Sequence, residues 1–425
     1  MNGNEMKALI TDLYPICRSI TGEGLRETLR RLQRLVPLEI REVASGTQVL
    51  DWTVPKEWSI RDAYVADATG KRVIDFKKSS LHVLNYSAPI RKRMPLADLR
   101  DHLHTLPDHP DWVPYRTSYY KETWGFCAAH RVVEALPAGD YEVVIDSTLA
   151  PGALSYGELV IPGSTPDEVL ISCHACHPSL ANDNLSGIAV AVALADALAA
   201  LPGRRLTYRF LFIPGTIGSI TWLATHEDTI PRIRHGLVLS CVGDGGAFTY
   251  KRSRRGNAPV DRAVAHALRH SRAAHTLRDF VPYGYDERQY CSPGFDLPVG
   301  CFMRTPNGEY PEYHTSADNL DLVRPAALEE SLGVLRAIVA VLEGDGRYRN
   351  TSPKGEPQLG RRGLYGSTGG AAHLPGFEFA LLWVLNFSDG AHSLLDIAER
   401  AGLPFATIRG AADALAAQGL LEALP

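Results

Sequence analysis

Residues 171–187 are ISCHACHPSLANDNLSG, and several of their side chains are of kinds that bind metal ions. His174 and His177 are three residues apart, and Asp183 follows His174 within ten residues. Imidazole nitrogens and carboxylate oxygens are ordinary zinc ligands. Histidines are also common as hydrogen-bonded core or surface residues, and an aspartate before a helix is a preferred N-cap. The stretch alone therefore predicts either a metal site or a polar turn.

Two cysteines share this stretch, Cys173 and Cys176, in a C-x-x-C arrangement. A structural zinc site of four cysteines needs a second C-x-x-C, and the chain has none. The seven cysteines are odd in number and lack the spacing of a disulfide framework, which favours a reducing compartment. We therefore expect a cytoplasmic protein in which this pair forms neither a disulfide nor a four-cysteine site.

Two more donors of the same kinds occur further along the chain. Asp244 ends the apolar stretch GLVLSCVGD, and His314 lies in the polar segment EYPEYHTSADNLD. Ligands of α/β sheets bind at the carboxyl ends of strands, so we expect these two side chains to converge with His174 and Asp183. His177 would be a fifth polar group or would orient one of the ligands. Taken singly, each residue is equally compatible with a cap, a turn or a hydrogen-bonded loop.

The elements that must position these donors alternate between strands and helices from residue 157 onward. The strands are apolar on both faces, which is typical of a sheet covered by helices on both sides. We predict strands at 157–163, 168–174, 205–215, 235–244 and 296–303, and helices at 184–201, 219–233, 258–271 and 326–344. The predicted fold class is therefore α/β.

Changes in local composition divide the chain further. Residues 49–149 are short β-branched and aromatic runs separated by Gly, Pro and Asp, and they predict an inserted β-rich domain. This insert would split an α/β domain made of residues 1–48 and 150–345, and would either roof the site or enclose a tryptophan core of its own. Residues 346–376 are dense in Gly, Pro, Ser and Arg and predict a linker. Residues 377–425 carry three short helical patterns that resemble a winged helix-turn-helix domain.

Charge and hydropathy limit the classes of partner. The formal net charge is -4 and the last helical pattern contains one basic residue, Arg409, so the sequence argues against DNA as a partner. A role in packing or dimer contacts suits that Ala-rich helix better, and a homo-oligomer is left open. The longest apolar run, LSGIAVAVALADALAAL, contains Asp196, and residues 1–32 are charged throughout. We therefore expect no signal peptide and no association with a membrane.

The motifs CHPSLANDNLSG and YPEYHTSADNL carry a resemblance to known proteins. Residues 157–343 look like zinc aminopeptidases of the M28 kind. The entire chain resembles a bacterial family of the DUF4910 and DUF2172 type, which has an aminopeptidase-like domain, an inserted β-rich domain and a C-terminal winged helix. The resemblance implies an M28-like α/β/α sandwich that holds one zinc ion, with a second ion left open. The metal ligands that it implies are His174, Asp183, Asp244 and His314.

One departure from this pattern concerns the catalytic base. The Glu-Glu-x-Gly of those enzymes corresponds here to GTIG, so Gly215 replaces the general base and Thr216 replaces a metal ligand. Proton transfer by a positioned carboxylate typically supplies ~10²–10⁴ in rate, so its loss should cripple hydrolysis unless another group acts. The candidate replacements are Glu309, Glu312 and Glu287.

A second departure is Cys176, which stands where the resemblance implies an aspartate that orients the metal centre. Either Cys176 or His177 could take that role. The segment YDERQYCSPGFDLPVG resembles the part of those enzymes that lies beside the substrate. On the substrate side we expect Arg288 and Tyr313.

These observations predict a zinc-dependent hydrolase that cleaves an amide bond of a peptide or small molecule, with its activity altered or lost at Gly215. Cyclisation of an N-terminal glutamine, the other reaction that the resemblance implies, also needs a carboxylate and is weakened equally. Two alternatives stay open: a non-catalytic metal- or ligand-binding protein, and a regulator with a degenerate peptidase domain. Gain of aminopeptidase activity in Gly215→Glu would show that the chain lacks only its base.

Overall fold

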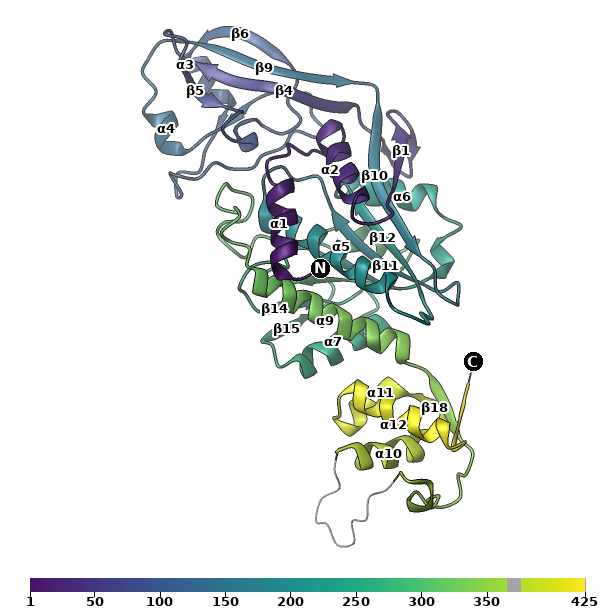
Figure 1. The fold of residues 1–425 in the computed structure, drawn as a ribbon. Helices are drawn as coiled ribbons and strands as arrows, with labels where there is room; N and C mark the ends of the chain where they lie inside the picture. The colour runs from purple at the N-terminus through teal and green to yellow at the C-terminus, as the bar shows by residue number, and fades with distance from the viewer. Residues whose placement is uncertain (365–375, 425) are drawn as a thin grey trace. The chain divides into compact units, whose positions relative to one another are not determined.

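The structure is a computed structural model that describes residues 1–364 and 376–424. The chain divides into two compact units. One consists of Met1–Ala258 with Ala274–Leu332, and the other of Pro259–Ala273 with Gly333–Pro425. The first unit contains a large mixed sheet, and the second contains a small sheet with helices (Figure 1).

An eight-stranded sheet forms the centre of the first unit, in the order β1-β10-β12-β11-β13-β16-β14-β15. Its strands are β1 (Glu39–Ala44), β10 (Ala153–Ile161), β11 (Glu168–His174), β12 (Thr207–Ile213), β13 (Ile233–Leu239), β14 (Phe248–Lys251), β15 (His275–Arg278) and β16 (Val299–Met303). The four central strands β12, β11, β13 and β16 are parallel, whereas β1, β10 and β14 join antiparallel. Every residue of β11 and β12 is buried, as their continuous apolar runs predict.

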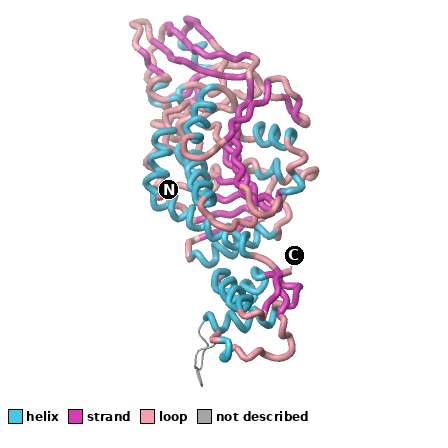
Figure 2. The backbone as a smooth tube through the Cα atoms, turned by 45° about the vertical axis from the view of Figure 1, so that its right-hand side comes forward, coloured by secondary structure: helices cyan, strands magenta, loops and turns pink. Residues whose placement is uncertain are grey.

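Helices lie on both sides of this sheet (Figure 2). They are α1 (Gly3–Leu13), α2 (Glu23–Gln33), α5 (Gly187–Ala199), α6 (Ile217–Thr225), α8 (Glu287–Tyr290) and the first turns of α9 (Pro325–Gly344). The Ala-rich run forms α5, which is buried from Gly187 to Ala195. The predicted α/β fold class, with a sheet covered by helices on both sides, is confirmed.

Three charged side chains form a buried network across the first unit's sheet. Arg209 on β12 donates to both oxygens of Glu168 on β11, at 2.7 and 3.0 Å, and to Glu158 on β10 at 2.5 Å. The indole Nε1 of Trp222 also donates to Glu158, at 3.0 Å. All three charged residues are buried. The arginine therefore compensates two carboxylates that have little access to water.

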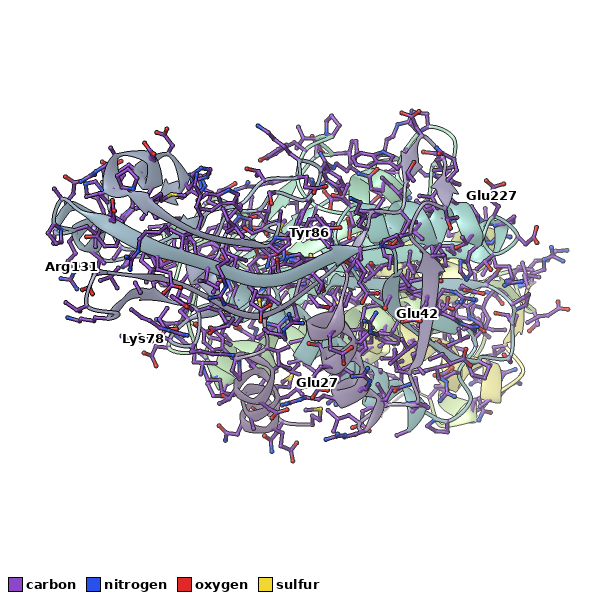
Figure 3. The ribbon with its side chains drawn as sticks, turned by 90° about the horizontal axis from the view of Figure 1, so that it is seen from above. Glu27, Glu42, Lys78, Tyr86, Arg131 and Glu227 are labelled. Atoms are coloured by element: carbon purple, nitrogen blue, oxygen red, sulfur yellow. The ribbon has the colours of Figure 1, made fainter. Side chains whose placement is uncertain are left out.

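A second sheet lies within the β-rich segment, in the order β5-β4-β9-β6. These strands are β4 (Glu57–Ala66), β5 (Arg72–Asp75), β6 (Ile90–Pro95) and β9 (Asp140–Ala150), and the short elements around them are β2 (Gln48–Val49), β3 (Trp52–Thr53), β7 (Leu103–His104), β8 (Phe126–Cys127), α3 (Leu96–Leu99) and α4 (His130–Glu134). Trp58 is only 1 % exposed and donates to the Ser87 carbonyl at 2.8 Å, so it is a core residue. Seen from above, Lys78 and Arg131 lie at the end of this segment remote from Glu227 (Figure 3).

The second unit contains α7 (Pro259–Ser271), the end of α9, and a winged-helix arrangement. Its further elements are β17 (Arg347–Asn350), α10 (Gly376–Phe387), β18 (Asp389–Ser393), α11 (Leu394–Ala401), α12 (Phe405–Ala417) and β19 (Leu421–Ala423). The sheet order is β18-β17-β19. Residues 347–350 therefore form a central strand where we expected linker, and residues 365–375 of that expected linker lie outside the described residues. Within the described ranges, no helix combines the length and apolar character needed to cross a bilayer.

Candidate metal centre

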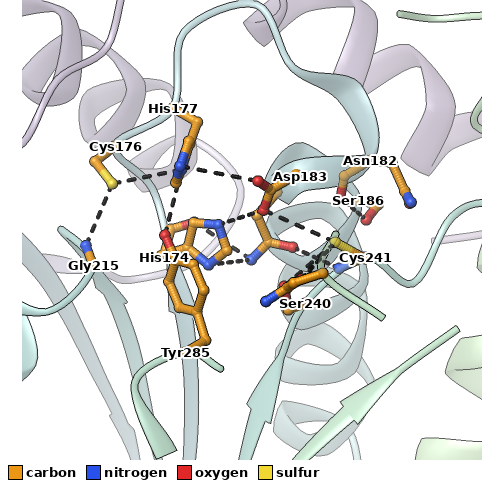
Figure 4. A network of polar contacts seen from close by, with 12 residues as sticks. His174, Cys176, His177, Asn182, Asp183, Ser186, Gly215, Ser240, Cys241 and Tyr285 are labelled. Carbon is orange, nitrogen blue, oxygen red and sulfur yellow. Dashed lines mark hydrogen bonds and ion pairs between the residues drawn. The ribbon is translucent and has the colours of Figure 1, made fainter. Parts of the chain in front are cut away.

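The carboxylate of Asp183 lies at the centre of a cluster of imidazoles at the carboxyl end of β11. Its Oδ1 is 2.8 Å from Nε2 of His174, and its Oδ2 is 3.0 Å from Nε2 of His314. Nε2 of His177 is 3.9 Å from the same Oδ2. The donor atoms of His174, His177 and Asp183 all lie within 4.8 Å of one another, and the three side chains are buried (Figure 4). The structure thus brings together three of the four predicted ligands, with His177 beside them.

Hydrogen bonds from neighbouring loops fix the position of the central carboxylate. The residues from Ala181 to Ser186 form a short irregular helical turn between β11 and α5. Asp318 accepts from the backbone N–H groups of Asn182 and Asp183, at 2.6 and 3.0 Å. The amide Nδ2 of Asn184 lies 3.2 Å from Nδ1 of His174 and donates to the Leu239 carbonyl at 2.9 Å. The Asp-Asn-x-Ser stretch therefore orients both the carboxylate and the first imidazole.

The charges of these groups suit a cation. Burial alone would raise the pKa of Asp183, but the adjacent His177 and His174 outweigh it and hold that pKa well below its usual value. Burial lowers the pKa of His174 and, more strongly, that of His177, against the opposing pull of Asp183. An ionised carboxylate and neutral imidazoles are the protonation states that metal binding requires. Nitrogen and oxygen donors in this arrangement fit zinc.

Asp244, the fourth predicted ligand, is not part of the group of mutually close donors among the described residues. Its Oδ2 accepts from the side-chain amide of Asn182 at 3.0 Å, and its Oδ1 accepts from the Thr305 hydroxyl at 2.8 Å and the Gly246 N–H at 2.6 Å. The physical reason is that β13 ends at Leu239, five residues before Asp244, and the chain turns at once. The structure thus corrects the expected geometry, because the carboxylate of Asp244 supports the surrounding loops.

Cys241 is the residue that this turn brings next to Asp183. Its Sγ is 3.9 Å from Oδ1 of Asp183 and 3.1 Å from Oδ1 of Asn307. Burial raises the pKa of the Cys241 thiol well above its usual value. No periodicity or motif in the sequence singled out this cysteine, because its position depends on where the strand ends.

Gly215 faces a space that an aromatic ring already fills. A Cβ at residue 215 would lie 2.7 Å from the hydroxyl oxygen of Tyr285. The Tyr285 ring stacks on His174, with centroids 3.6 Å apart and an interplanar angle of 24°. The next residue, Thr216, donates its backbone N–H to Asp286 at 2.6 Å and begins α6. Tyr285 opens the segment YDERQYCSPGFDLPVG, which was expected beside the substrate, but its contacts with Gly215 and His174 had no signal in the sequence.

The three glutamates proposed as replacement bases have other surroundings. Glu309 forms an ion pair with Arg278, and Glu287 forms a buried ion pair with Lys251. Glu287 also accepts from the Tyr285 N–H at 3.2 Å. None of these carboxylates, nor that of Glu312, belongs to the group of close donors in the described part of the chain. The structure therefore does not bring a glutamate into the cluster.

Other predicted residues lie around the cluster in different roles. Cys176 accepts from the Gly215 N–H at 3.4 Å and lies 3.6 Å from Nδ1 of His177. The Tyr313 ring stacks on His314 with centroids 4.0 Å apart. Nε of Arg288 is buried without a hydrogen-bond partner among the residues that the structure describes. Tyr313 thus lies against a donor, as expected for a substrate-side residue.

A loop of the β-rich segment covers part of the cluster. Tyr115 donates its N–H to the His314 carbonyl at 2.7 Å, and its ring packs edge-on against His177 and His314, with centroids 5.1 and 5.0 Å away. The Val113 N–H donates to the Ser316 hydroxyl at 2.9 Å. This part of the segment therefore packs against both imidazoles, while the His314 side chain stays 34 % exposed. A position over the site is one of the two roles that the sequence left open.

A cavity of about 250 Å³ opens beside the cluster. Tyr285 and Tyr313, which stack on His174 and His314, are among its lining residues. Tyr283 and Asn307 line it as well. Aromatic faces with a few polar groups are typical of small-molecule sites.

Backbone strain gathers around the same cluster. Thr216, Cys241 and His314 have φ angles of 61°, 50° and 55°, which non-glycine residues rarely adopt. Each such residue costs about 1–3 kcal/mol and persists only where the surroundings enforce it. Strain of this kind is common at functional sites, so it supports a functional reading of the cluster.

Comparisons with known proteins agree with this geometry. The model of a domain of unknown function (DUF4910) matches residues 7–345, and a winged helix-turn-helix model (HTH_47) matches residues 346–423. A Clostridium acetobutylicum protein, described provisionally as a polysaccharide biosynthesis protein with an aminopeptidase-like domain, is 50 % identical over 420 residues, covering 99 % of this chain and 96 % of its own.

Solved structures give the same picture. A crystal structure of a provisionally described peptidase from C. acetobutylicum is 48 % identical with a TM-score of 0.95, over 99 % of this chain and 96 % of that one. BSAP, a zinc aminopeptidase from Bacillus subtilis, matches with a TM-score of 0.57 at 15 % identity, over 80 % of this chain and 94 % of that one. At this low identity the second likeness shows the aminopeptidase-like fold alone.

Proposed function

The chain belongs to the family described as a domain of unknown function (DUF4910), joined to a winged helix-turn-helix domain, and from this premise we propose that it is a metal-dependent hydrolase of the aminopeptidase-like type. Its substrate would be an amide of a peptide or small molecule. His174, Asp183 and His314 would hold one zinc ion, with His177 as a further ligand or as a support for the others.

The observation that carries this proposal is the position of Asp183 between two imidazoles. One carboxylate oxygen faces His174 and the other faces His314, although 131 residues separate Asp183 from His314. A histidine–carboxylate cluster buried at strand ends is expensive to assemble unless a cation or substrate uses it. When bound, a zinc ion would supply Lewis acidity for an amide carbonyl.

The chain's own residues would bind and orient the substrate beside that ion. The rings of Tyr285 and Tyr313 line the cavity and stack on two of the donors. Tyr115 packs against His177, which is buried, and against His314, which is partly open to solvent. A relative is provisionally described as a polysaccharide biosynthesis protein. The panel of amides to be tested as substrates should therefore contain amides carried on sugars as well as aminoacyl amides.

A second candidate is a non-catalytic metal- or ligand-binding protein. It is favoured by Gly215, which replaces the carboxylate that the resemblance implies, and by Tyr285, which fills the adjacent space. The two candidates share metal binding and differ only in turnover.

Metal analysis of the purified protein, followed by the amide panel, tests both candidates. We expect about one zinc per chain, and amide hydrolysis that is lost with His314→Ala. Asp244→Asn is the matched control, because it changes a nearby buried aspartate that is not in the donor group. Stoichiometric zinc without hydrolysis of any amide would favour the second candidate. A protein that takes up no zinc would contradict the first candidate and the metal-binding form of the second.

The winged helix-turn-helix domain keeps DNA as a partner to be tested. Arg409 on α12 pairs with Asp413, which weakens the case for a phosphate contact there. Salt-dependent retardation of duplex DNA would support the regulator with a degenerate peptidase domain. The seven cysteines are free, which supports a reducing compartment such as the cytoplasm.

A further inference from the structure

Cys241 carries a thiol into the candidate metal centre from the loop after β13, a segment that supplies none of the ligands assigned above. We propose that Cys241 binds the cation as a thiolate, together with Asp183 and His174. This inference rests on the proposed function, because it requires a cation at this centre.

The backbone of Cys241 is fixed on both sides. Its N–H donates to Oδ1 of Asn184 at 3.2 Å, and its carbonyl accepts from the Arg304 N–H at 2.9 Å. Its φ of 50° lies in the left-handed region, which a cysteine adopts only when neighbouring contacts enforce it. The same Asn184 side chain contacts His174, so one amide positions both the thiol and the imidazole.

The position of the sulfur suits a shared cation. Sγ lies 3.9 Å from Oδ1 of Asp183, the oxygen that also faces His174. Zinc–sulfur and zinc–oxygen bonds of roughly 2.3 and 2.0–2.2 Å place two tetrahedral ligands about 3.5 Å apart. Cys241 is outside the group of donors that lie within 4.8 Å of one another, so the cation would draw the ligands together as it binds.

Charge balance gives an independent reason for a thiolate. Among the proposed ligands, Asp183 is the single carboxylate, so a divalent cation on it would keep one positive charge that the ligands themselves do not balance. Such a charge is costly away from water. If the thiol of Cys241 loses its proton to solvent and its sulfur donates an electron pair to the cation, the charges sum to zero.

Cys176 offers a matched control within the same cluster. It is buried like Cys241, but its Sγ contacts Nδ1 of His177, whereas Nε2 of that ring faces Asp183. Figure 4 shows the two sulfurs on opposite sides of the Asp183 carboxylate. Cys176 is therefore expected to remain a thiol when the cation binds.

Cobalt(II) titration of the metal-depleted full-length protein tests this assignment, because a thiolate on cobalt gives an intense near-ultraviolet charge-transfer absorption. We expect this absorption in the wild type and in Cys176→Ser. In Cys241→Ser it should vanish, with cobalt affinity at least 10-fold weaker, about the smallest effect of removing a group that supports a metal site. Cys241→Asp should retain cobalt through its carboxylate while lacking the absorption.

The outcomes separate this inference from the proposed function. Stoichiometric cobalt without the absorption, or an absorption that survives in Cys241→Ser, overturns the role of Cys241 and leaves the proposed metal centre standing. A wild type that binds neither cobalt nor zinc overturns both. If Cys241→Ser fails to fold, the wild type, Cys176→Ser and Cys241→Asp still decide.

Discussion

The space beside Gly215 makes the substitution Gly215→Glu an informative perturbation. From the sequence alone, a glutamate there should restore aminopeptidase activity. In the structure, even a Cβ at that position would lie 2.7 Å from the Tyr285 hydroxyl oxygen and 3.1 Å from the carbon that bears it. The first distance is shorter than real Cβ contacts allow and the second is tight, so the Tyr285 ring must shift before a carboxylate can enter.

The magnitude follows from packing. Forcing extra atoms into a well-packed site costs about 1–3 kcal/mol, and a buried carboxylate without a partner adds to this. We therefore expect Gly215→Ala to lower the free energy of unfolding by about 1–3 kcal/mol and Gly215→Glu by more. Neither single variant should gain activity, because displacement of Tyr285 also disturbs its stacking on His174.

A double-mutant cycle isolates the clash. Tyr285→Ala removes the ring, so Gly215→Glu should be less destabilising in that background, with a coupling energy of at least ~1 kcal/mol for residues in contact. Denaturant unfolding and initial rates on the amide panel are the assays. Gly333→Ala is the control, since a Cβ there has open space around it in helix α9, and it should be neutral or stabilising.

Two results would refute this reasoning. One is a Gly215→Glu variant that gains hydrolysis at unchanged stability, which would mean that the ring yields without penalty. The other is a cycle in which the two substitutions are strictly additive, which would mean that residue 215 and Tyr285 do not compete for the same space.

Three further substitutions test other parts of the first unit. Arg209→Met should lower the free energy of unfolding by about 1–3 kcal/mol, because both buried carboxylates lose their hydrogen bonds from this arginine while Arg232 still pairs with Glu168, and unchanged chemical denaturation would contradict this. Gly187→Ala would place a Cβ 2.4 Å from Oδ1 of Asn184, which contacts His174, so zinc affinity measured by chelator competition should fall ~10–100-fold. Burial raises the pKa of Asp286 from 3.8 to about 7, so the folded state holds this proton to higher pH than the unfolded state. The resulting stability is full below about pH 4 and is lost as pH rises to about 7, by on the order of 4 kcal/mol. Asp286→Asn should therefore raise the melting temperature relative to wild type at pH 8 and not at pH 4, and an equal difference at both would argue against the shift.

The sequence predicted the parts of the site that depend on strand ends. Continuous apolar runs marked β11, β12, β13 and β16, and the parallel order of these strands brings their carboxyl ends to one edge of the sheet. The meeting of His174, Asp183 and His314 follows from that topology together with the two motifs. His174 is predictable in this way because it is the last residue of β11, whereas Asp183 and His314 lie outside the strands and were expected from the two motifs.

The residues that the sequence did not reveal depend on contacts between distant segments. Asp244 was predicted from its place after an apolar run, but the strand ends earlier, and a side-chain contact from Asn184 turns Cys241 toward the cluster. Tyr285 reaches Gly215 from a segment 70 residues later, and Tyr115 approaches His314 across 199 residues. Neither approach has a periodic signal, because each depends on complementary shapes of two loops.

The second unit shows a different limit of structure prediction from sequence. Residues 347–350 lie in a segment rich in Gly, Pro, Ser and Arg, a composition that favours a linker, yet they pair with β18 and β19. Arg347 and Arg349 flank Tyr348 in this strand, with no apolar alternation to mark it. A short strand is stabilised mainly by its neighbours, so local composition is a weak guide to it.

The surroundings of Gly215 bear on whether the site has decayed or has been rebuilt. Loss of a glutamate by itself would leave a void against His174, and voids in a packed interior are destabilising. Instead the Tyr285 ring fills that space, and its N–H donates to the Glu287 carboxylate at 3.2 Å. Glu287 is paired with buried Lys251, which in turn donates to the Tyr283 carbonyl at 2.7 Å. This buried ion pair holds Tyr285 against His174. It is difficult to explain as a remnant of an active site that decayed by neutral mutation, because each charged partner would be destabilising without the other. The ring that fills the space beside Gly215 is thus held by a buried ion pair, which argues for a retained site and leaves turnover to be decided by the amide panel.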